Sequence, residues 1–456
     1  MKHCAANDQI KYMEKIMKKL ISILILCSVM LASCTVGGSP PELSSGPSDS
    51  SAHSPVLSGD VSDLPDSTAV TDPATEPITD PLTEPVTEPV TEPPAPTERR
   101  LSFLAAGDDL IHEGIIEDAR QADGSYSFIS KYDEIAAMVS AADVAFINQE
   151  TPMCGERYGY AGWPRFNSPQ QLGLDLISLG FDVLCFANNH MADKMKQSDP
   201  ALDGRAMSDM MDFTDTLDAL VLGLHRSFED YETIRYLNVD GVKIAFLAYT
   251  YATNAYWQDK TPADGVYLPI ILDRAIKRQL AAARESADFV IVSMHWGTEN
   301  SHTVNDEQRR LARLLADGGA DVVIGTHPHV VQSVEWFDRP DGGRMLCYYS
   351  LGNLISNQES FANNIGYLAM FDLVMNDEGR RVEADAVVPI FNFHDKNKRE
   401  AKIYTLDHLT EDIVAAHYSN QNRASGASPY TIASIHSIIK ENVPAEFLPG
   451  SLGGDR

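Results

Sequence analysis

Short runs of apolar residues recur along the chain from residue 101, and polar or small residues follow each run. Runs of this length, rich in Val, Ile, Phe and Leu, are typical of strands that are buried on both faces. Segments with helical spacing of apolar residues lie between many of them, so the pattern predicts an α/β fold. The predicted strands are 101–105, 144–147, 183–186, 243–248, 289–293, 322–324 and 345–349, and the predicted helices are 129–141, 169–179, 208–217, 272–285 and 305–317.

The last hundred residues show a different pattern. Residues 368–375 and 382–390 flank the turn-forming sequence Asn376-Asp377-Glu378-Gly379, which predicts a β-hairpin. Residues 409–419 have helical spacing, and we expect residues 448–456 to form a frayed end.

Metal-binding residue types follow six of the predicted strands. Taken singly, each has an ordinary structural explanation: a Gly-Asp pair forms turns, an Asn-Asn-His run caps helices, and a His-Pro-His run stiffens loops. Ligands of open α/β sheets bind beyond the carboxyl ends of the strands, so together these residues predict one metal site there. They are Asp108 and Asp109; Asn148 and Glu150; Asn188, Asn189, His190 and Asp193; His295, Trp296 and Glu299; His327 and His329; and Ser350 and Asn353.

The residue types narrow the choice of metal. Histidine combined with carboxylate and amide oxygen suits Mn, Zn or Fe better than Ca or Mg alone. Four or more ligands from separate strands favour two ions, about 3.5–4 Å apart, that share a bridging carboxylate. The sequence has no nucleotide-binding glycine loop and no Gly-x-Ser-x-Gly elbow, and Ser350 remains an alternative nucleophile.

The amino-terminal residues predict export. Residues 1–33 carry a net charge of +3, and Lys18-Lys19 precedes an apolar stretch that is short for a membrane-spanning helix. The stretch ends at Leu31-Ala32-Ser33-Cys34, which resembles a bacterial lipobox. We therefore predict that residues 1–34 are a lipoprotein signal and that Cys34 carries lipid. The alternative is an ordinary signal peptide with a chance cysteine, and translation could start at Met13 or Met17.

Residues 35–98 differ from the rest of the chain in composition. They have a net charge of −12 and contain 13 of the 25 prolines, with Thr-Glu-Pro repeats. This composition predicts a disordered linker that holds a domain away from the membrane. The domain is predicted to span 99–395, followed by an extension over 396–456. The formal net charge of −29 argues against nucleic acid as a partner.

The strand-end motifs resemble those of the CapA-type poly-γ-glutamate capsule synthesis proteins, a branch of the calcineurin-like metallophosphoesterases. The resemblance covers about 101–357 and is carried by six motifs in order, and the lipobox with the glycine-aromatic loop 158–169 resembles the lipoprotein members. These motifs are Gly107-Asp108, Asn148-x-Glu150, Asn188-Asn189-His190-x-x-Asp193, His295-Trp296-Gly297-x-Glu299, His327-Pro328-His329 and Tyr349-Ser350-Leu351-Gly352-Asn353.

The resemblance implies a two-sheet β-sandwich flanked by helices, and it assigns roles to the motif residues. Asp108 would bind the first metal, Asn189 and His295 the second, and Glu150 would bridge them. His327 and His329 would contribute one ligand to each ion. His190 and Asp193 would be catalytic, with His190 beside the metals. The pocket would be completed by Asn188, Trp296, Glu299 and Asn353.

The sequence departs from the superfamily pattern at two positions. Leu110 stands where the superfamily has a metal-binding histidine, and His112 is a candidate replacement. Glu150 is one methylene longer than the usual bridging aspartate.

The resemblance also implies a function. We expect an exported, lipid-anchored protein of poly-γ-glutamate capsule or cell-surface polymer biosynthesis with a phosphoesterase-type site. Its partners would be an anionic polymer or a small phosphate-containing substrate. The alternative is a non-catalytic protein that holds polymer or phosphate in the same pocket. Candidates for a local cationic site, which could equally be solvated surface residues, are Arg120, Lys131, Arg157, Arg165 and Arg226.

Overall fold

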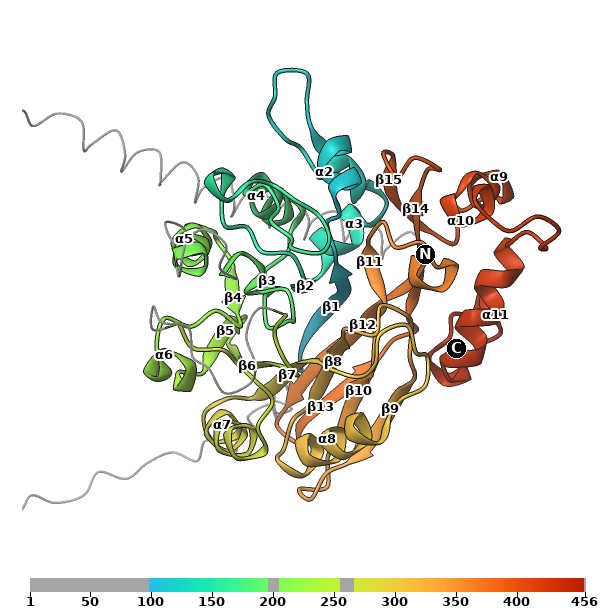
Figure 1. Cartoon of the computed structure of the whole chain (residues 1–456). Helices are drawn as coiled ribbons and strands as arrows, with labels where there is room; N and C mark the ends of the chain where they lie inside the picture. Colours follow the sequence, from blue (N-terminus) through green and yellow to red (C-terminus); the bar gives the residue numbers. More distant parts are fainter. Residues whose placement is uncertain (1–97, 196–204, 255–265, 455–456) are drawn as a thin grey trace, which may run out of the picture. The chain divides into compact units, whose positions relative to one another are not determined.

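A computed structural model describes residues 98–195, 205–254 and 266–454 (Figure 1). The predicted signal, Cys34 and all of the predicted linker except Glu98 lie outside the described residues. None of the helices in these three ranges has the length and apolar character needed to cross a membrane.

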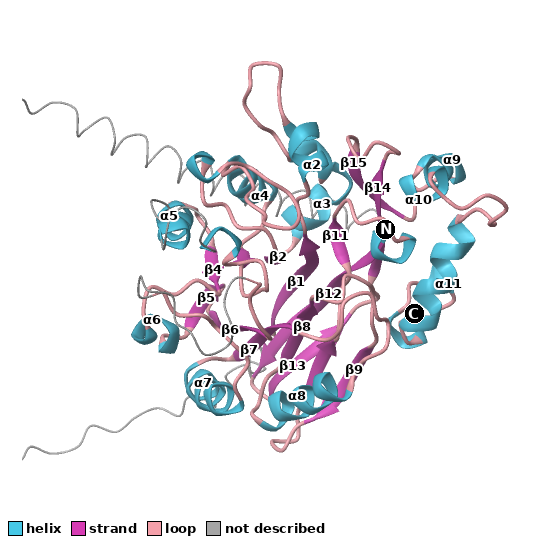
Figure 2. Cartoon of the chain, in the orientation of Figure 1, coloured by secondary structure: helices cyan, strands magenta, loops and turns pink. Residues whose placement is uncertain are grey.

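The described residues form two β-sheets with helices outside them (Figure 2). The first sheet has the order β15-β14-β12-β1-β2-β3-β4, with β11 paired to β1 and β13 paired to β12. The second has the order β5-β6-β7-β8-β10-β9. The strands are β1 (Arg99–Asp109), β2 (Val144–Gln149), β3 (Val183–Cys185), β4 (Leu220–Leu222), β5 (Arg235–Val239), β6 (Val242–Thr250), β7 (Phe289–His295), β8 (Val322–Thr326), β9 (Val334–Asp338), β10 (Arg344–Tyr348), β11 (Asn353–Ile355), β12 (Ile365–Asn376), β13 (Gly379–Ala384), β14 (Val388–His394) and β15 (Ala401–Thr405).

The helices lie in most of the connections between strands up to β8, and the last three helices follow β15. Five of them lie close to the predicted segments, and α8 begins with a capping box in which Asn305 and Gln308 bond each other's backbone. The helices are α2 (Glu113–Ala119), α3 (Asp133–Ala141), α4 (Gln171–Leu179), α5 (Arg205–Thr214), α6 (Phe228–Glu232), α7 (Asp273–Ser286), α8 (Asp306–Asp317), α9 (Glu411–Ala416), α10 (Tyr418–Gln421) and α11 (Ile432–Asn442).

The two sheets pack face to face between two helical layers. Successive strand side chains point to opposite faces, so Phe103 of β1 enters the core between the sheets, while Leu104 enters the core beneath the helices. The ring of Phe103 lies 6.3 Å from that of Phe246 on β6, in the other sheet. On the outer face of the second sheet, Leu280 of α7 and Leu311 of α8 are buried. This confirms the predicted helix-flanked, two-sheet α/β fold.

The carboxyl-terminal residues belong to the same packed unit. β15 lies beyond the boundary expected after residue 395, and it pairs antiparallel with β14. The expected frayed end is wrong for Leu452, which is 2% exposed and belongs to the same buried apolar cluster as Phe103. The predicted helix over 409–419 is also wrong in detail, because His417 has an extended backbone and divides it into α9 and α10.

The predicted hairpin is correct in its turn but not in its second strand. β12 and β13 pair antiparallel from Asn376 and Gly379 onwards. The segment predicted as 382–390 is shared between β13 and β14, and β14 pairs with a different part of β12. One apolar run therefore contributes to two strands.

Candidate metal centre

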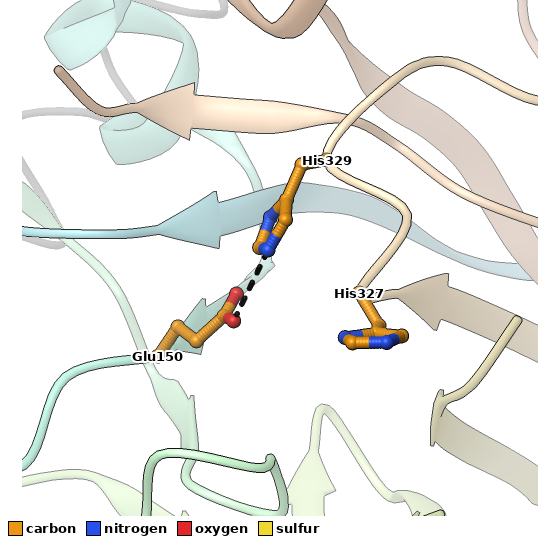
Figure 3. Close-up of side chains that lie close together, drawn as sticks. All are labelled: Glu150, His327 and His329. Atoms are coloured by element: carbon orange, nitrogen blue, oxygen red, sulfur yellow. Dashed lines mark ion pairs between the residues drawn. The ribbon is translucent and has the colours of Figure 1, made fainter. Parts of the chain in front are cut away.

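Parallel strands from both sheets deliver histidines and carboxylates to a single buried site. Asp108 belongs to the end of β1, Glu150 follows β2, and His295 ends β7. His327 and His329 follow β8, and all five side chains are at most 3% exposed. Figure 3 shows Glu150 facing His329, with His327 on the same loop as His329. The structure thus brings together the side chains that the sequence motifs singled out.

Two groups of donor atoms overlap at one carboxylate. In the first group, donor atoms of Glu150, His327 and His329 all lie within 4.8 Å of one another. In the second group, donor atoms of Asp108, Glu150 and His295 meet the same limit. Glu150 Oε1 lies 3.8 Å from His295 Nε2 and 3.7 Å from His329 Nε2. Glu150 is therefore the one residue that the two donor groups share.

Asp108 and Asn189 flank this carboxylate. Asp108 Oδ2 lies 3.0 Å from His329 Nδ1 and also accepts a hydrogen bond from the backbone N–H of His327. Asn189 Oδ1 lies 3.0 Å from His295 Nε2. These contacts place all six sequence-selected metal ligands in one cluster.

The unpaired atoms of the cluster fit a bound cation. Glu150 Oε1 and His327 Nδ1 are buried without a hydrogen-bond partner among the described residues. Burial, followed by the neighbouring charge of Asp108, raises the pKa of Glu150 well above its usual value. Burial lowers the pKa of His327 to about 3 and lowers the pKa of His295, so both rings are neutral donors. Two adjacent buried carboxylates are costly unless a positive charge compensates them, which a divalent ion does.

The loop that carries the two histidines has an unusual backbone. His327 has φ 98° and His329 has φ 59°, in the left-handed region that favours glycine. Such conformations cost about 1–3 kcal/mol each and concentrate at functional sites. Gly325 permits this loop to lie close to β10, because a Cβ there would stand 2.1 Å from the Tyr349 carbonyl oxygen.

His190 lies beside the donor cluster rather than in either donor group. Its Nδ1 donates to Asp193 Oδ2 over 2.7 Å, and the same oxygen accepts from the Phe166 backbone N–H over 2.9 Å. Asn188 Oδ1 accepts from the His190 backbone N–H. Asp193 therefore fixes the orientation of the His190 ring, whose Nε2 points away from the Asp193 carboxylate.

The other sequence-selected pocket residues have different positions. Asn353 Oδ1 lies 3.0 Å from His329 Nδ1, so Asn353 helps to orient that ring. Glu299 lines a cleft next to His190. Trp296 is a correction, because its side chain is 1% exposed and its Nε1 donates to the Tyr349 carbonyl in the core under α7 and α8. His295 is the last residue of β7 and Trp296 follows it directly, and the two side chains lie on opposite sides, one in the donor cluster and the other in the core.

Three nearby residues were missed by the sequence analysis. The Tyr251 ring lies 4.5 Å from that of His327, and the Phe166 ring meets His190 edge-on at 4.7 Å. Asn254 Nδ2 lies 3.3 Å from His190 Nδ1. Tyr251 directly follows Thr250, the last residue of β6. The residues after six other predicted strands were considered as ligands, and the same comparison at the end of β6 would have found Tyr251.

His112, the candidate replacement ligand, is engaged elsewhere. Its Nδ1 lies 2.9 Å from the Leu110 carbonyl and 3.2 Å from the Asn357 backbone nitrogen, and neither donor group contains it. Its ring meets the edge of Phe166 at 5.2 Å. Only Nε2 is left to approach an ion.

We expect His112→Ala to leave the metal content within about two-fold of the wild-type value. The matched variant His329→Ala should lower metal affinity by about 10–100-fold, the size of effect that follows damage to a ligand shell. Elemental analysis of both purified variants measures this. An equal loss of metal in the two variants would make His112 a ligand.

The fold and the site define the class of protein: a two-sheet α/β protein with a buried centre of histidines and carboxylates that is compatible with metal binding. Its family follows from comparison. The family model described as "Bacterial capsule synthesis protein PGA_cap" matches residues 102–358, more than half of the chain, and the chain belongs to this family. The family predicted from the sequence motifs is thereby confirmed.

Two curated relatives are similar over part of their length. The "Capsule biosynthesis protein CapA" of Bacillus anthracis is 32% identical over 181 residues, which cover 39% of this chain and 41% of the relative. The "PGA biosynthesis protein CapA" of Bacillus subtilis (strain 168) is 33% identical over 206 residues, which cover 45% of this chain and 50% of the relative. The chain therefore spans half or less of the length of these relatives.

Similarity to solved structures is more distant. A calcineurin-like phosphoesterase, YfkN from Bacillus subtilis, is 14% identical with a TM-score of 0.36, and the match covers 76% of this chain and 97% of that one. A hypothetical protein from Thermus thermophilus is 16% identical with a TM-score of 0.38, over 67% of this chain and 99% of the other.

Proposed function

We propose that this protein is an exported, lipid-anchored component of cell-surface polymer biosynthesis that hydrolyses a phosphoester at a two-metal centre. The observation that carries the proposal is the position of Glu150, whose carboxylate is common to both donor groups. The names of the two curated relatives, as capsule and PGA biosynthesis proteins, support a role in polymer synthesis. The substrate would be an anionic polymer or a smaller phosphate-containing molecule.

The donor set indicates which cations would be held. Imidazole nitrogen with carboxylate and amide oxygen suits Mn, Zn or Fe. Asp108, Asn189 and His295 would hold one side of the centre, and Glu150 would serve both. His327 and His329 would hold the other side together, whereas the family resemblance implies one of them for each ion. When bound, such ions supply Lewis-acid activation at phosphorus and lower the pKa of a neighbouring water.

The role of His190 in this proposal is to move a proton. Asp193 accepts a hydrogen bond from the His190 Nδ1–H group, so Nε2 is the ring atom that can exchange a proton with a leaving group. His190 is 7% exposed and lines the floor of the cleft, which limits access by water.

A phosphodiester assay tests the proposal. The wild-type protein loaded with Mn²⁺ should hydrolyse bis(p-nitrophenyl) phosphate, and His190→Ala should lower kcat by about 100-fold with unchanged metal content. His302→Ala, a histidine outside the donor groups, should leave kcat unchanged. Absence of turnover in a fully metal-loaded wild-type protein would refute hydrolysis.

One observation favours a second candidate, a non-catalytic binding protein. Leu110 stands where the superfamily has a metal ligand, and His112 belongs to neither donor group. A centre with one weak cation site would still bind phosphate. A single ion per chain, with phosphate binding and without turnover, would favour this candidate.

Membrane anchoring through Cys34 is a separate part of the proposal. Cys34→Ser should release the protein from the membrane fraction or leave its signal uncleaved, because a diacylated cysteine supplies the two chains that stable anchoring needs. Cell fractionation followed by mass spectrometry of the amino terminus measures both outcomes. Unchanged membrane retention with normal cleavage would contradict lipid anchoring.

A further inference from the structure

A cleft of about 450 Å³ opens next to the donor cluster. Its floor contains His190 and Asp193, which are 7% and 2% exposed. We call the exposed residues around its mouth the cleft rim, and they are Trp163, Pro164, Arg165, Asn254 and Glu299. The Asn254 backbone N–H at the rim donates to the Asn189 carbonyl over 2.7 Å, so the cleft adjoins the metal centre.

Trp163 is the most unusual residue of the rim. Its side chain is 75% exposed, and the other exposed large hydrophobic residues of the described chain reach at most 55%. Within the described ranges, no aromatic ring or cation stacks on its indole. A flat apolar face left open at the mouth of a polar cleft is suited to the apolar face of a ligand.

The polar groups of the rim are suited to hydroxyl groups. Glu299 offers a carboxylate that forms no ion pair within the described residues, and Asn254 offers an amide. Arg165 is the one cationic side chain among the described residues that line the cleft. Three other candidate cations do not line the cleft. Lys131 pairs with Asp118, Arg157 with Asp209, and Arg226 with Asp212 and Asp215.

We propose that the cleft selects a glycosyl phosphate, with a pyranose ring on Trp163 and its phosphoester directed past His190 to the metal centre. The axial C–H groups of a pyranose form an apolar face that covers an indole. The ring hydroxyls can donate to Glu299 and accept from Asn254. This inference rests on the proposed function, because it names the substrate class of the same centre.

The rim chemistry distinguishes this ligand from two others. A polyanionic glutamyl chain carries a carboxylate on every residue, and the carboxylates of Asp193 and Glu299 would repel it. Arg165 is the one cation of the described lining that would attract it. A nucleotide would place an aromatic base on Trp163, but the described rim provides one aromatic ring and not a pair. A pyranose uses both the flat face and the hydroxyl-binding groups.

Calorimetric titration of the Mn²⁺-loaded full chain tests the proposal with matched probes. Glucose 1-phosphate and glycerol 3-phosphate both carry a phosphate monoester, but only the first has a pyranose. We expect glucose 1-phosphate to bind about ten-fold more tightly, from apolar contact with the indole. Trp163→Ala should abolish this preference, whereas Phe228→Ala, at an aromatic residue that is 55% exposed outside the cleft lining, should preserve it.

Other outcomes would overturn the inference. Equal affinity for the two probes in the wild-type protein, or tighter binding of adenosine monophosphate or of tri-γ-glutamate, would exclude a pyranose site. Methyl glucoside, which has the ring but no phosphate, reports on the rim alone in saturation-transfer NMR, and its failure to contact Trp163 would also refute the site. A pyranose preference without turnover would refute only the hydrolase, and turnover without the preference would refute only the pyranose site.

Discussion

Replacing Glu150 with glutamine is expected to lower the affinity of the whole centre for metal by about 100-fold or more. The carboxylate lies 3.8 Å from His295 Nε2 and 3.7 Å from His329 Nε2, so its charge serves both donor groups. The amide keeps the shape of the side chain and removes that charge. Elemental analysis after gel filtration measures the loss, and Glu335→Gln, a carboxylate outside both groups, is the matched control.

The same substitution should stabilise the metal-free protein. Burial and the charge of Asp108 raise the pKa of Glu150 well above 4.5, so the folded chain binds this proton more tightly than the unfolded chain. The stabilising effect of that proton is complete below about pH 4.5 and is lost as the pH rises through the raised pKa. In EDTA at pH 7.5, Glu150→Gln should therefore resist urea better than the wild type. Retained metal, or lower metal-free stability at pH 7.5, would contradict a bridging Glu150.

A second large effect is expected in mild acid, from two histidines far from the metal centre in sequence. His394 ends β14 and His417 lies between α9 and α10, and their buried rings are 4.6 Å apart. Burial lowers the pKa of His394 to about 4 and that of His417 to about 3. The pKa of each ring is therefore lower in the folded chain than in the unfolded chain, where it is about 6.5. The neutral ring stabilises the fold above pH 6.5, and this contribution is lost as the pH falls toward the pKa in the folded chain.

The expected loss is about 2–3 kcal/mol for each ring between pH 7.5 and pH 4.5. His417→Phe should reduce the fall in unfolding free energy over this range by that amount, because a phenyl ring packs among the neighbouring phenylalanines without titrating. Urea unfolding of both proteins at the two pH values measures this fall in free energy. His417→Phe also loses the hydrogen bond from the Ser419 backbone N–H, but that loss is present at both pH values and cancels in the difference. His436→Gln, on a more exposed ring of α11, is the control. An unchanged fall in His417→Phe would refute the effect.

The strands that could be predicted from the sequence are those buried on both faces. β7 is one example, since its whole length is apolar up to Ser293 and all seven residues are buried. Its polar end could be searched for ligands without knowledge of the sheet order, because carboxyl ends of parallel strands share an edge. This reasoning found Asp108, Glu150 and His295.

The remaining features depend on tertiary placement. One donor group contains Asp108 and His295, and the other contains His327 and His329. The sequence did not predict this division, because it depends on how the two sheets face each other. Trp163 and Asn254 come from loops, and a loop's sequence does not encode which strand end it approaches. At the break between α9 and α10, the His417 ring lies beside that of His394, a contact between residues of different elements that the sequence pattern did not indicate.

The most direct test of a two-metal centre is a crystal structure of the Mn²⁺-soaked protein, with anomalous scattering collected at the manganese edge. We expect two anomalous peaks about 3.5–4 Å apart, with the Glu150 carboxylate between them. One peak should lie next to Asp108 and His295, and the other next to His327 and His329. A single peak remote from Glu150, or no peak among these side chains at full Mn²⁺ occupancy in solution, would contradict the proposed centre.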